Sequence, residues 1–484
     1  MCKRRIRLGS ANGNQPPSIL FVFSDQQHWE AVGFADASFE TPNQTRLASE
    51  GIVFRNAFCT TPQCSPSRSS IMTGLYPSRT GVWGNIGSAG GNPLQMRTIG
   101  ARLRESGYRT AYFGKWHLGK DPVGTDGWDE DFGVTGPETT DDREVTRRAI
   151  RFLQATGKTD RPFALFLSYN NPHDIYHFDG ESDPTPKRAV ALPPTWHDKD
   201  LATVPFVQQQ FMTEDQGRIM TGTGYPAWER YRELYREKVK LYDEELGRVL
   251  AALKDRDLDD STLVIATSDH GDMDGQHRLI YKGPFMYEHM MRVPLIIRPP
   301  AASRRKRALT VDFHTVNVDL VPTLAEFAGI ELPDTDGVSL KPFIEHQAPF
   351  CARQFVIGQY YSKQKWVNPI RMVRTAHYKY NRYQKHGEEL YDLATDPLEL
   401  QNRAHDPDCN HVKQELASIL THWMDDNGDP FDTQLPTTRE GAVDDSGRRE
   451  QITSGDCPNR PPLSSTEKAG KRTAKQRSMT CPSV

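Results

Sequence analysis

The sequence lacks three features that would each assign it to a class of protein. No run of about eighteen apolar residues occurs in its 484 residues, so we expect no transmembrane helix and no membrane partner. Its 60 lysines and arginines nearly balance its 63 aspartates and glutamates, which excludes the strongly basic surface of a nucleic-acid-binding protein. It has no Cys-x-x-Cys pair and an odd number of cysteines, seven, so we expect neither a thiolate zinc site nor a disulfide scaffold.

The N-terminus also lacks the apolar core of a signal peptide, although it is basic (MCKRRIRLGS). From the sequence as written we therefore expect a cytoplasmic protein. A misplaced start codon or a trimmed N-terminus would leave the same pattern, and the expected location would then be periplasmic or secreted.

Apolar runs alternate with helical patterns along most of the chain. Residues 18–24 (SILFVFS) are continuously apolar, which is typical of a strand buried on both faces of a parallel sheet. Residues 227–254 have apolar side chains at a period near 3.6, which predicts a long helix. This alternation predicts an α/β fold with a largely parallel sheet. Further strands are predicted at 109–113, 162–169, 262–268 and 294–298, and further helices at 97–106 and 141–155.

The pattern changes after about residue 345. Residues 355–361, 370–380 and 389–393 are typical of shorter strands, and residues 411–425 form one amphipathic helical pattern. We expect a small antiparallel sheet with a helix packed on it. The predicted organisation is a disordered segment at 1–15, a catalytic α/β domain at 16–345, a small α+β subdomain at 346–435 and a disordered tail at 436–484.

Two predicted strands end in residues that bind cations. Asp25 and Gln26 follow the first strand, and Asp269 and His270 follow the strand at 262–268. In sheets of this kind, sites form at the carboxyl ends of the strands. Carboxylate and amide oxygens suit calcium or magnesium, and the histidine nitrogen also suits manganese or zinc. The spacing predicts a metal site, and for one such aspartate alone an ordinary strand-end turn is the alternative.

Cys64 precedes a predicted helix in the segment CSPSRSSIMTG. Pro66 suits the first turn of that helix, and a thiolate or oxyanion is stabilised beside a helix N-terminus. Arg68 lies about one turn further along and can reach back. Cys64 is thus either a nucleophile or a small buried cysteine before a helix.

Four cationic or titratable residues also lie near strand ends. Lys115 and His117 are two residues apart in GYRTAYFGKWHLG, so in an extended backbone they share a face and could bind an anion and move a proton. His173 follows the strand at 162–169, and Lys282 lies in YKGP. The alternatives are a solvated strand end for Lys115 and His117, a structural histidine at His173 and a solvated lysine at Lys282. Together with the residues above, they predict a site for a tetrahedral oxyanion ester, a sulfate or a phosphate.

At this point the sequence resembles a known family. CSPSRSSIMTG has the Cys-x-Pro-Ser-Arg and Thr-Gly signature of type I sulfatases, which carry formylglycine, and GYRTAYFGKWHLGK resembles their second signature. VFSDQ, NNPHD, ATSDHGD and ELYDLATDPLELQN are also similar to family segments, over residues 16–425 in all. The chain is identified as a member of this formylglycine-dependent family of the alkaline phosphatase superfamily. The resemblance implies an alkaline-phosphatase-like fold, a large mixed, mostly parallel sheet flanked by helices with a smaller C-terminal antiparallel sheet plus helix.

The resemblance also implies two cofactors. A formylglycine-generating maturation enzyme would oxidise Cys64 to formylglycine, whose gem-diol would supply the nucleophile. One divalent metal, calcium with manganese as the alternative, would polarise the sulfate. Its ligands would be Asp25, Gln26, the modified Cys64, Asp269 and His270.

Roles for the remaining residues follow from the same resemblance. Arg68 would hold the gem-diol oxygens. Lys115, Lys282 and His173 would contact sulfate oxygens, and His173 would also protonate the leaving alcohol. His117 would take the proton when the hemiacetal sulfate collapses.

Two positions depart from the common family pattern. Many sulfatases have a second aspartate where Gln26 stands and an asparagine where His270 stands. The pair found here is similar to that of phosphonate monoester hydrolases, so a phosphonate monoester or phosphodiester hydrolase on the same fold is an alternative. A catalytically silent sulfatase-like binding protein is a second alternative, but it would require the loss of a key residue, and none is lost.

The loops between these segments should form the leaving-group pocket. They span residues 83–97, 174–226 and 273–281, and the middle loop is rich in proline, histidine, aspartate and aromatic residues. Such a lining suits a polar, ring-bearing substrate, although a loop that merely covers the sheet is equally consistent with this composition. We expect a sulfated carbohydrate as substrate, as in polysaccharide degradation, with aryl or small alkyl sulfates second.

Overall fold

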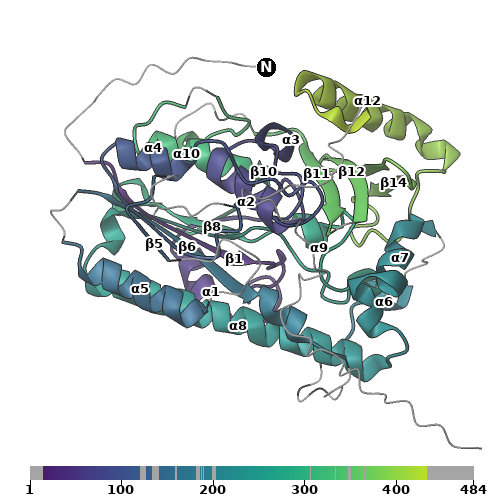
Figure 1. Cartoon of the computed structure of the whole chain (residues 1–484), viewed down its shortest axis with the longest axis horizontal. Coiled ribbons are helices and arrows are strands. Elements are labelled where there is room, and N and C mark those ends of the chain that lie inside the picture. The colour runs from purple at the N-terminus through teal and green to yellow at the C-terminus, as the bar shows by residue number, and fades with distance from the viewer. Residues whose placement is uncertain are drawn as a thin grey trace, which may run out of the picture. The chain divides into compact units, whose positions relative to one another are not determined.

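The structure, a computed structural model, covers most of the chain (Figure 1). The predicted disordered ends, residues 1–15 and 436–484, lie outside the described residues apart from Gln15. The described residues are 15–119, 127–132, 141–157, 161–180, 186, 188, 190–198, 203–305, 307–332, 334–346, 350, 352–364 and 366–432.

A large sheet forms the centre of the fold, with the strand order β5-β4-β6-β1-β7-β8-β2-β9. Neighbouring strands are parallel except at β8, which is antiparallel to both β7 and β2. The predicted mixed, mostly parallel sheet is therefore confirmed. Its strands are β1 (Ser18–Asp25), β2 (Ile52–Phe54), β4 (Arg109–Gly114), β5 (Glu130–Phe132), β6 (Phe163–Pro172), β7 (Thr262–Ser268), β8 (Leu295–Arg298) and β9 (Leu309–Val311).

Helices cover both faces of this sheet (Figure 1). Successive side chains of a strand point to opposite faces. Leu20 and Val22 of β1 accordingly join one apolar cluster, which includes residues of α1, α5 and α8, whereas Phe21 and Phe23 join the other, which includes residues of α2, α4 and α10. Burial on both faces explains why the strand sequences are apolar without alternation. These helices are α1 (Pro42–Ser49), α2 (Cys64–Thr73), α4 (Ile99–Glu105), α5 (Asp142–Gln154), α8 (Tyr225–Asp255) and α10 (Leu320–Phe327).

The register of the central strands brings their carboxyl ends to one edge. Strand β1 lies between β6 and β7, and Ser24 pairs with Ser268. The residues that follow this pair, Asp25 and Asp269, therefore leave the sheet at the same level.

The C-terminal sheet contains four antiparallel strands in the order β11-β12-β13-β14, and α12 (Asn410–Asp426) packs across β12 and β13. The predicted small antiparallel sheet with one helix is confirmed. The strands are β11 (Val356–Lys363), β12 (Trp366–Arg374), β13 (Tyr378–Tyr383) and β14 (Gly387–Asp392).

One predicted strand is wrong. Residues 370–380 form a hairpin rather than a single strand, because the chain turns between Arg374 and Tyr378. The backbone N–H of Thr375 donates to the carbonyl of Tyr378 at 2.8 Å, and the Tyr378 N–H donates to the Thr375 hydroxyl at 3.1 Å. The turn sequence Thr-Ala-His contains none of the glycine, proline, asparagine or aspartate residues that mark turns, so nothing in the pattern indicated it.

Shorter elements complete the described part of the chain. Strands of two or three residues, such as β2 and β9, were not predicted because they are too short to show a period. No helix among the described residues has both the length and the apolar character that crossing a membrane requires. The shorter elements include α3 (Pro77–Thr80), α6 (Pro194–Asp198), α7 (Phe206–Glu214), α9 (Glu288–Met291) and α11 (Lys341–Ile344), and the parallel pair β3 (Ala57–Phe58) and β10 (Thr315–Val316).

Candidate active site

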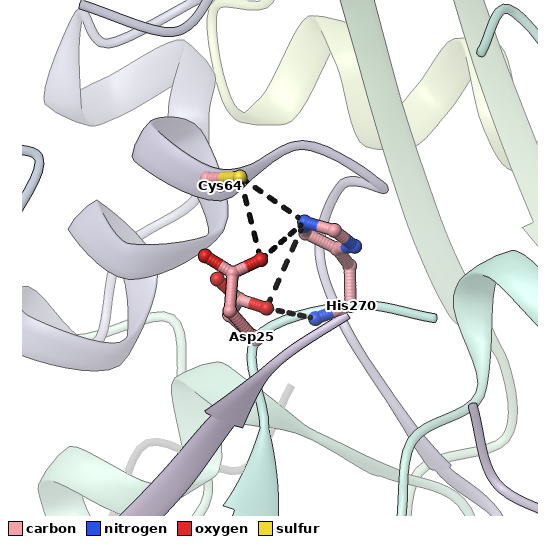
Figure 2. Close-up of side chains that lie close together, drawn as sticks. Asp25, Cys64 and His270 are labelled. Carbon is pink, nitrogen blue, oxygen red and sulfur yellow. Dashed lines mark hydrogen bonds and ion pairs between the residues drawn. The ribbon is translucent and has the colours of Figure 1, made fainter. Parts of the chain in front are cut away.

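Four side chains that can bind a cation converge at the carboxyl edge of the large sheet. The ligand atoms of Asp25, Cys64, Asp269 and His270 all lie within 4.8 Å of one another, and all four residues are buried. Figure 2 shows Asp25, Cys64 and His270 pointing toward one another from separate segments. The Cys64 Sγ lies 3.3 Å from His270 Nε2 and 3.7 Å from Asp25 Oδ1. The structure thus brings together four of the predicted site residues.

The two strand-end aspartates are held in place by backbone hydrogen bonds. The Asp269 N–H donates to the carbonyl of Ser24 at 3.2 Å, which continues the pairing of β1 with β7 by one residue. In return, the Gln26 N–H donates to Asp269 Oδ1 at 3.1 Å. The expectation that adjacent strand ends would place these residues together is met by this geometry.

Cys64 is the first residue of α2, as its position before Pro66 predicted. The residue before it, Gln63, is extended, and α2 ends at Gly74, whose φ of 74° is in the left-handed region that favours glycine. The Ser67 hydroxyl donates to the backbone carbonyl of Asp269, so the first turn of α2 is tied to the end of β7. Cys64 therefore lies at a helix N-terminus and has no solvent exposure.

Arg68 pairs with both aspartates of the site. Its Nε donates to Asp269 Oδ2 at 2.9 Å and its Nη2 to Asp25 Oδ2 at 3.0 Å, and all three side chains are buried. Burial alone would raise the pKa of Asp25, as would the nearby Cys64. The charges of Lys115, His173 and Arg68 outweigh them and hold that pKa below its ordinary value. The carboxylate is thus kept in the ionised form that a cation requires.

Both predicted lysines are buried beside this group rather than solvated. The Lys115 Nζ lies 2.8 Å from Asp25 Oδ2. The Lys282 Nζ donates to Cys64 Sγ at 3.0 Å and to Gln26 Oε1 at 2.9 Å. Gly114 allows the turn into Lys115, because its φ is 112° and a Cβ there would lie 1.9 Å from the carbonyl oxygen of Ser168.

Both predicted histidines also approach Cys64. His117 is buried and has a positive φ of 55°. His173 begins a short 3-10 helix directly after β6. Burial, together with the charge of Lys115, lowers the pKa of His173 to about 4, although a hydrogen bond with Cys64 acts in the opposite direction. The structure therefore places His173 beside Cys64, as its predicted role requires.

The surrounding cations make Cys64 an anionic position. Burial by itself would raise the pKa of its thiol, but Lys282, Lys115 and His270, and a hydrogen bond with His117, lower it well below its ordinary value. The site thus stabilises negative charge at residue 64. A tetrahedral oxyanion carries charge of this sign.

The donor set fits a hard divalent cation. Asp25 and Asp269 offer carboxylate oxygens, His270 offers Nε2, and Gln26 lies next to them with its oxygen toward Lys282. Oxygen-rich sets of this composition are those of calcium, and the histidine is compatible with manganese. These residues, with residue 64, would hold the metal that the sequence predicted.

Some residues at the site were not anticipated. Ser168, the β6 residue that pairs with Gly114, accepts a hydrogen bond from Arg68 at 2.8 Å. Asp272 accepts one from the Gln26 amide at 2.7 Å. Tyr176 lies with its ring 5.4 Å from the Lys282 Nζ. Asp272 could have been noticed as the second acidic residue of the segment SDHGD, and Tyr176 lies in the aromatic-rich loop predicted at 174–226, whereas Ser168 had no distinguishing signal in the sequence.

Comparison with known families agrees with this geometry. The family model described as Sulfatase matches residues 17–330, which is more than half of the chain. A model described as N-sulphoglucosamine sulphohydrolase, C-terminal, matches residues 275–426. The chain belongs to the sulfatase family of the alkaline phosphatase superfamily. The predicted family and enzyme class, a hydrolase of sulfate esters, are confirmed.

The chain is similar to its relatives over most of its length. It is 29% identical to a Δ4,5-hexuronate-2-O-sulfatase of Bacteroides thetaiotaomicron, over 87% of this chain and 92% of the relative. It is 30% identical to the uncharacterised sulfatase YidJ of Escherichia coli K12, over 86% and 88%. Among solved structures, a 2-O GAG sulfatase superimposes with a TM-score of 0.78 at 26% identity, over 87% of this chain and 94% of that one.

Proposed function

We propose that the protein hydrolyses a sulfate ester of a sulfated carbohydrate, using formylglycine made from Cys64 and one divalent cation, calcium or else manganese. The observation that carries the proposal is the buried group in which Asp25, Cys64, Asp269 and His270 meet. Lys115 and Lys282 border the same group, as recognition of a sulfate requires.

The cofactors would supply two things when present, a nucleophilic hydroxyl at residue 64 and a positive charge that polarises the sulfate. Lys115 and Lys282 hold sulfate oxygens, and Arg68 balances the carboxylates and steadies the oxygens on residue 64. His173, at the end of β6, donates a proton to the leaving oxygen, because the negative charge of a bound sulfate raises the pKa of this histidine from the value of about 4 that it has without substrate. His117 removes a proton from residue 64. Because all of this occurs in a buried site, these charges act at low dielectric.

The substrate class rests on two lines of support. One is the printed activity of the relatives, among them a Δ4,5-hexuronate-2-O-sulfatase and an N-acetylglucosamine-6-O-sulfatase of Bacteroides thetaiotaomicron. The other is the position of Tyr176, which comes from the middle loop predicted to form the pocket. Its ring lies 4.8 Å from that of His173 and 4.1 Å from that of Tyr281. Aromatic rings of this kind stack on the apolar faces of sugars.

The test is an assay of matured protein against a panel of esters. Because Cys64 is buried, the protein should be co-expressed with a formylglycine-generating enzyme, and conversion of Cys64 confirmed by peptide mass spectrometry. The panel contains sulfated mono- and oligosaccharides, aryl sulfates, phosphodiesters and phosphonate monoesters, and ion chromatography reports the anion released. We expect sulfate from a sulfated sugar as the fastest product. A strong preference for a simple aryl sulfate over every sulfated sugar would overturn the substrate class.

A phosphorus ester hydrolase is the second candidate, and one observation favours it. Gln26 is neutral and stands beside the metal group, where its N–H donates to Asp269 and its side-chain oxygen accepts from Lys282, so the site carries one carboxylate fewer than in many sulfatases. Faster cleavage of the phosphodiesters or phosphonate monoesters in the same panel would establish this candidate instead.

A further inference from the structure

The side-chain amide of Gln26 has two different neighbours. Its oxygen accepts a hydrogen bond from the Lys282 Nζ at 2.9 Å, and its nitrogen donates to Asp272 Oδ2 at 2.7 Å. All three residues are buried. The two ends of an amide are chemically distinct, since only the oxygen can bind a cation or accept from an ammonium group. The orientation of this amide therefore decides whether Gln26 can serve the metal site.

Asp272 is the residue that distinguishes the two ends. An ionised carboxylate only accepts hydrogen bonds, so it can face the nitrogen of Gln26 but not the oxygen. Asp272 is itself held by the hydroxyl of Tyr231, at 2.9 and 3.1 Å from its two oxygens, and by the Asp274 N–H at 2.7 Å. The Tyr231 oxygen also accepts from the Tyr281 N–H at 3.0 Å, which leaves the hydroxyl proton directed at Asp272.

The helix that carries Tyr231, α8, also fixes the backbone of Gln26. Its φ of 76° is in the left-handed region, which is uncommon for a residue with a side chain. The hydroxyl of Tyr235 donates to its carbonyl oxygen at 2.8 Å. Tyr235 follows Tyr231 by one turn of α8, so one face of this helix holds both the backbone and, through Asp272, the side chain of Gln26.

We propose that Asp272 and Tyr231 are positioning residues that lock the Gln26 amide with its oxygen toward the metal ligands and Lys282. If the amide were flipped, its NH₂ group would face the Lys282 ammonium and any bound cation. The inference rests on the proposed function, because it assigns Gln26 as a metal ligand. The proposal adds a chain of hydrogen bonds that runs from α8 through Asp272 to Gln26. Residues that hydrogen-bond to a metal ligand in this way change the affinity for the metal.

Calcium binding tests this inference directly. Matured protein is stripped with a chelator and titrated with Ca²⁺ alone by calorimetry. Because loss of an outer partner costs about 10–100-fold in metal affinity, Asp272→Ala should weaken calcium binding by at least about tenfold. Tyr231→Phe keeps the Gln26–Asp272 bond and should weaken binding by less. Saturating calcium should restore much of the sulfate release, which loss of structure alone would not allow.

The matched control is Tyr242→Phe. Tyr242 is also buried on α8, and its hydroxyl has no hydrogen-bond partner among the described residues. This variant should bind calcium as the wild type does. Wild-type affinity in Asp272→Ala, or equal losses in Tyr231→Phe and Tyr242→Phe, would overturn the proposal.

A double-mutant cycle keeps the test decisive if Asp272→Ala does not fold. In the single variant Gln26→Glu, the new carboxylate faces the carboxylate of Asp272, and the two repel each other. In the double variant with Asp272→Asn, which has nearly the same shape, the Glu oxygen can accept a hydrogen bond from the Asn amide. Gln26→Glu should therefore raise calcium affinity at least about tenfold more in the Asp272→Asn background than in the wild type. An equal effect in both backgrounds would overturn the inference. Failure of the wild type to release sulfate would instead refute the proposed function, so the two failures are distinguishable.

Discussion

Two regions of this molecule bury ionised side chains, and the arrangement of these charges differs between the two regions. At the edge of the large sheet, Asp25 and Asp269 share Arg68, while Lys115 and Lys282 crowd the same small volume as Cys64. The buried charges there converge on one point.

In the C-terminal sheet, two buried cations lie against carboxylates of opposite charge, one on β12 and one on β13. Arg371 of β12 binds Asp429 through two hydrogen bonds, at 2.6 and 2.7 Å, and both side chains have no exposure. Lys379 of β13 similarly lies 2.7 Å from both Glu288 and Glu399. Burial and strong electrostatics are therefore common to both regions. What distinguishes the site is that its cationic and acidic side chains all gather around one residue, Cys64.

The largest effect is expected from removing this central residue. Cys64→Ala should abolish sulfate release, by about 10³-fold or more, because no nucleophile can then form. The fold should persist, since α2 stays tied to the end of β7 through the Ser67 hydroxyl and the Asp269 carbonyl, which the substitution leaves in place. An unchanged rate in this variant, compared with wild type matured in parallel, would show that the two regions do not differ as described.

The second-largest effect is expected from the removal of a metal ligand. Asp269→Asn should lose calcium affinity by at least about 100-fold, because loss of a mere outer partner already costs about 10–100-fold. Calorimetry with Ca²⁺ and the rate of sulfate release at limiting calcium both measure this. Full activity of Asp269→Asn at limiting calcium would mean that Asp269 is not a ligand.

The matched change in the other region should have the opposite profile. Asp429→Asn leaves the buried Arg371 without its counter-charge and should lower the free energy of unfolding by about 3–5 kcal/mol. The kcat/KM of the folded protein should stay unchanged, because neither residue approaches the site. Urea unfolding and an aryl sulfatase assay below the transition check both parts. A loss of kcat/KM without a loss of stability would break the comparison.

A buried carboxylate outside both regions, Asp142, extends the comparison to the effect of pH. Among the described residues, the hydrogen-bond donors to Asp142 are all neutral, namely the N–H groups of Asn170 and Asn171 and the Asn171 side chain, and burial raises its pKa from 3.8 to about 7. Between these values Asp142 keeps a proton in the folded state that it releases in the unfolded state, so its contribution to stability falls as pH rises from about 4 to 7.

Asp142→Asn removes this titration. Relative to the wild type, the variant should gain a few kcal/mol in the free energy of unfolding as pH rises through that window, at about 1.4 kcal/mol per unit of pKa difference. Urea unfolding at several pH values measures how the free energy of unfolding changes with pH. The lost hydrogen-bond acceptor shifts this free energy by the same amount at every pH, so it does not affect the slope. Parallel stability curves for the two proteins would contradict the prediction.

The smallest effect belongs to a pair at the surface. Arg55 and Asp312 lie 2.6 Å apart, but their side chains are 56% and 61% exposed. Water screens such a pair, so Asp312→Asn should change the free energy of unfolding by less than about 1 kcal/mol. A change comparable to that of Asp429→Asn would show that burial does not set the scale of these interactions.

The positions that could be predicted from the sequence are those whose role follows from a local pattern. Asp25 and Asp269 stand at the ends of apolar strands, and Cys64 stands at the start of a helix whose first turn contains Pro66, so their meeting follows from the geometry of parallel sheets. The hairpin at Thr375 was missed because its turn has no residue that favours a turn.

The amino-acid sequence by itself determined the α/β class, the strand ends that carry the site and the family, because these depend on short-range periodicity and contiguous motifs. Only the tertiary structure decided how the site is held. Arg68 bridges two strand ends that are 244 residues apart in sequence, and Asp272 orients Gln26 under the control of Tyr231 on α8. Such contacts depend on which segments pack together in space, and no local pattern encodes that choice.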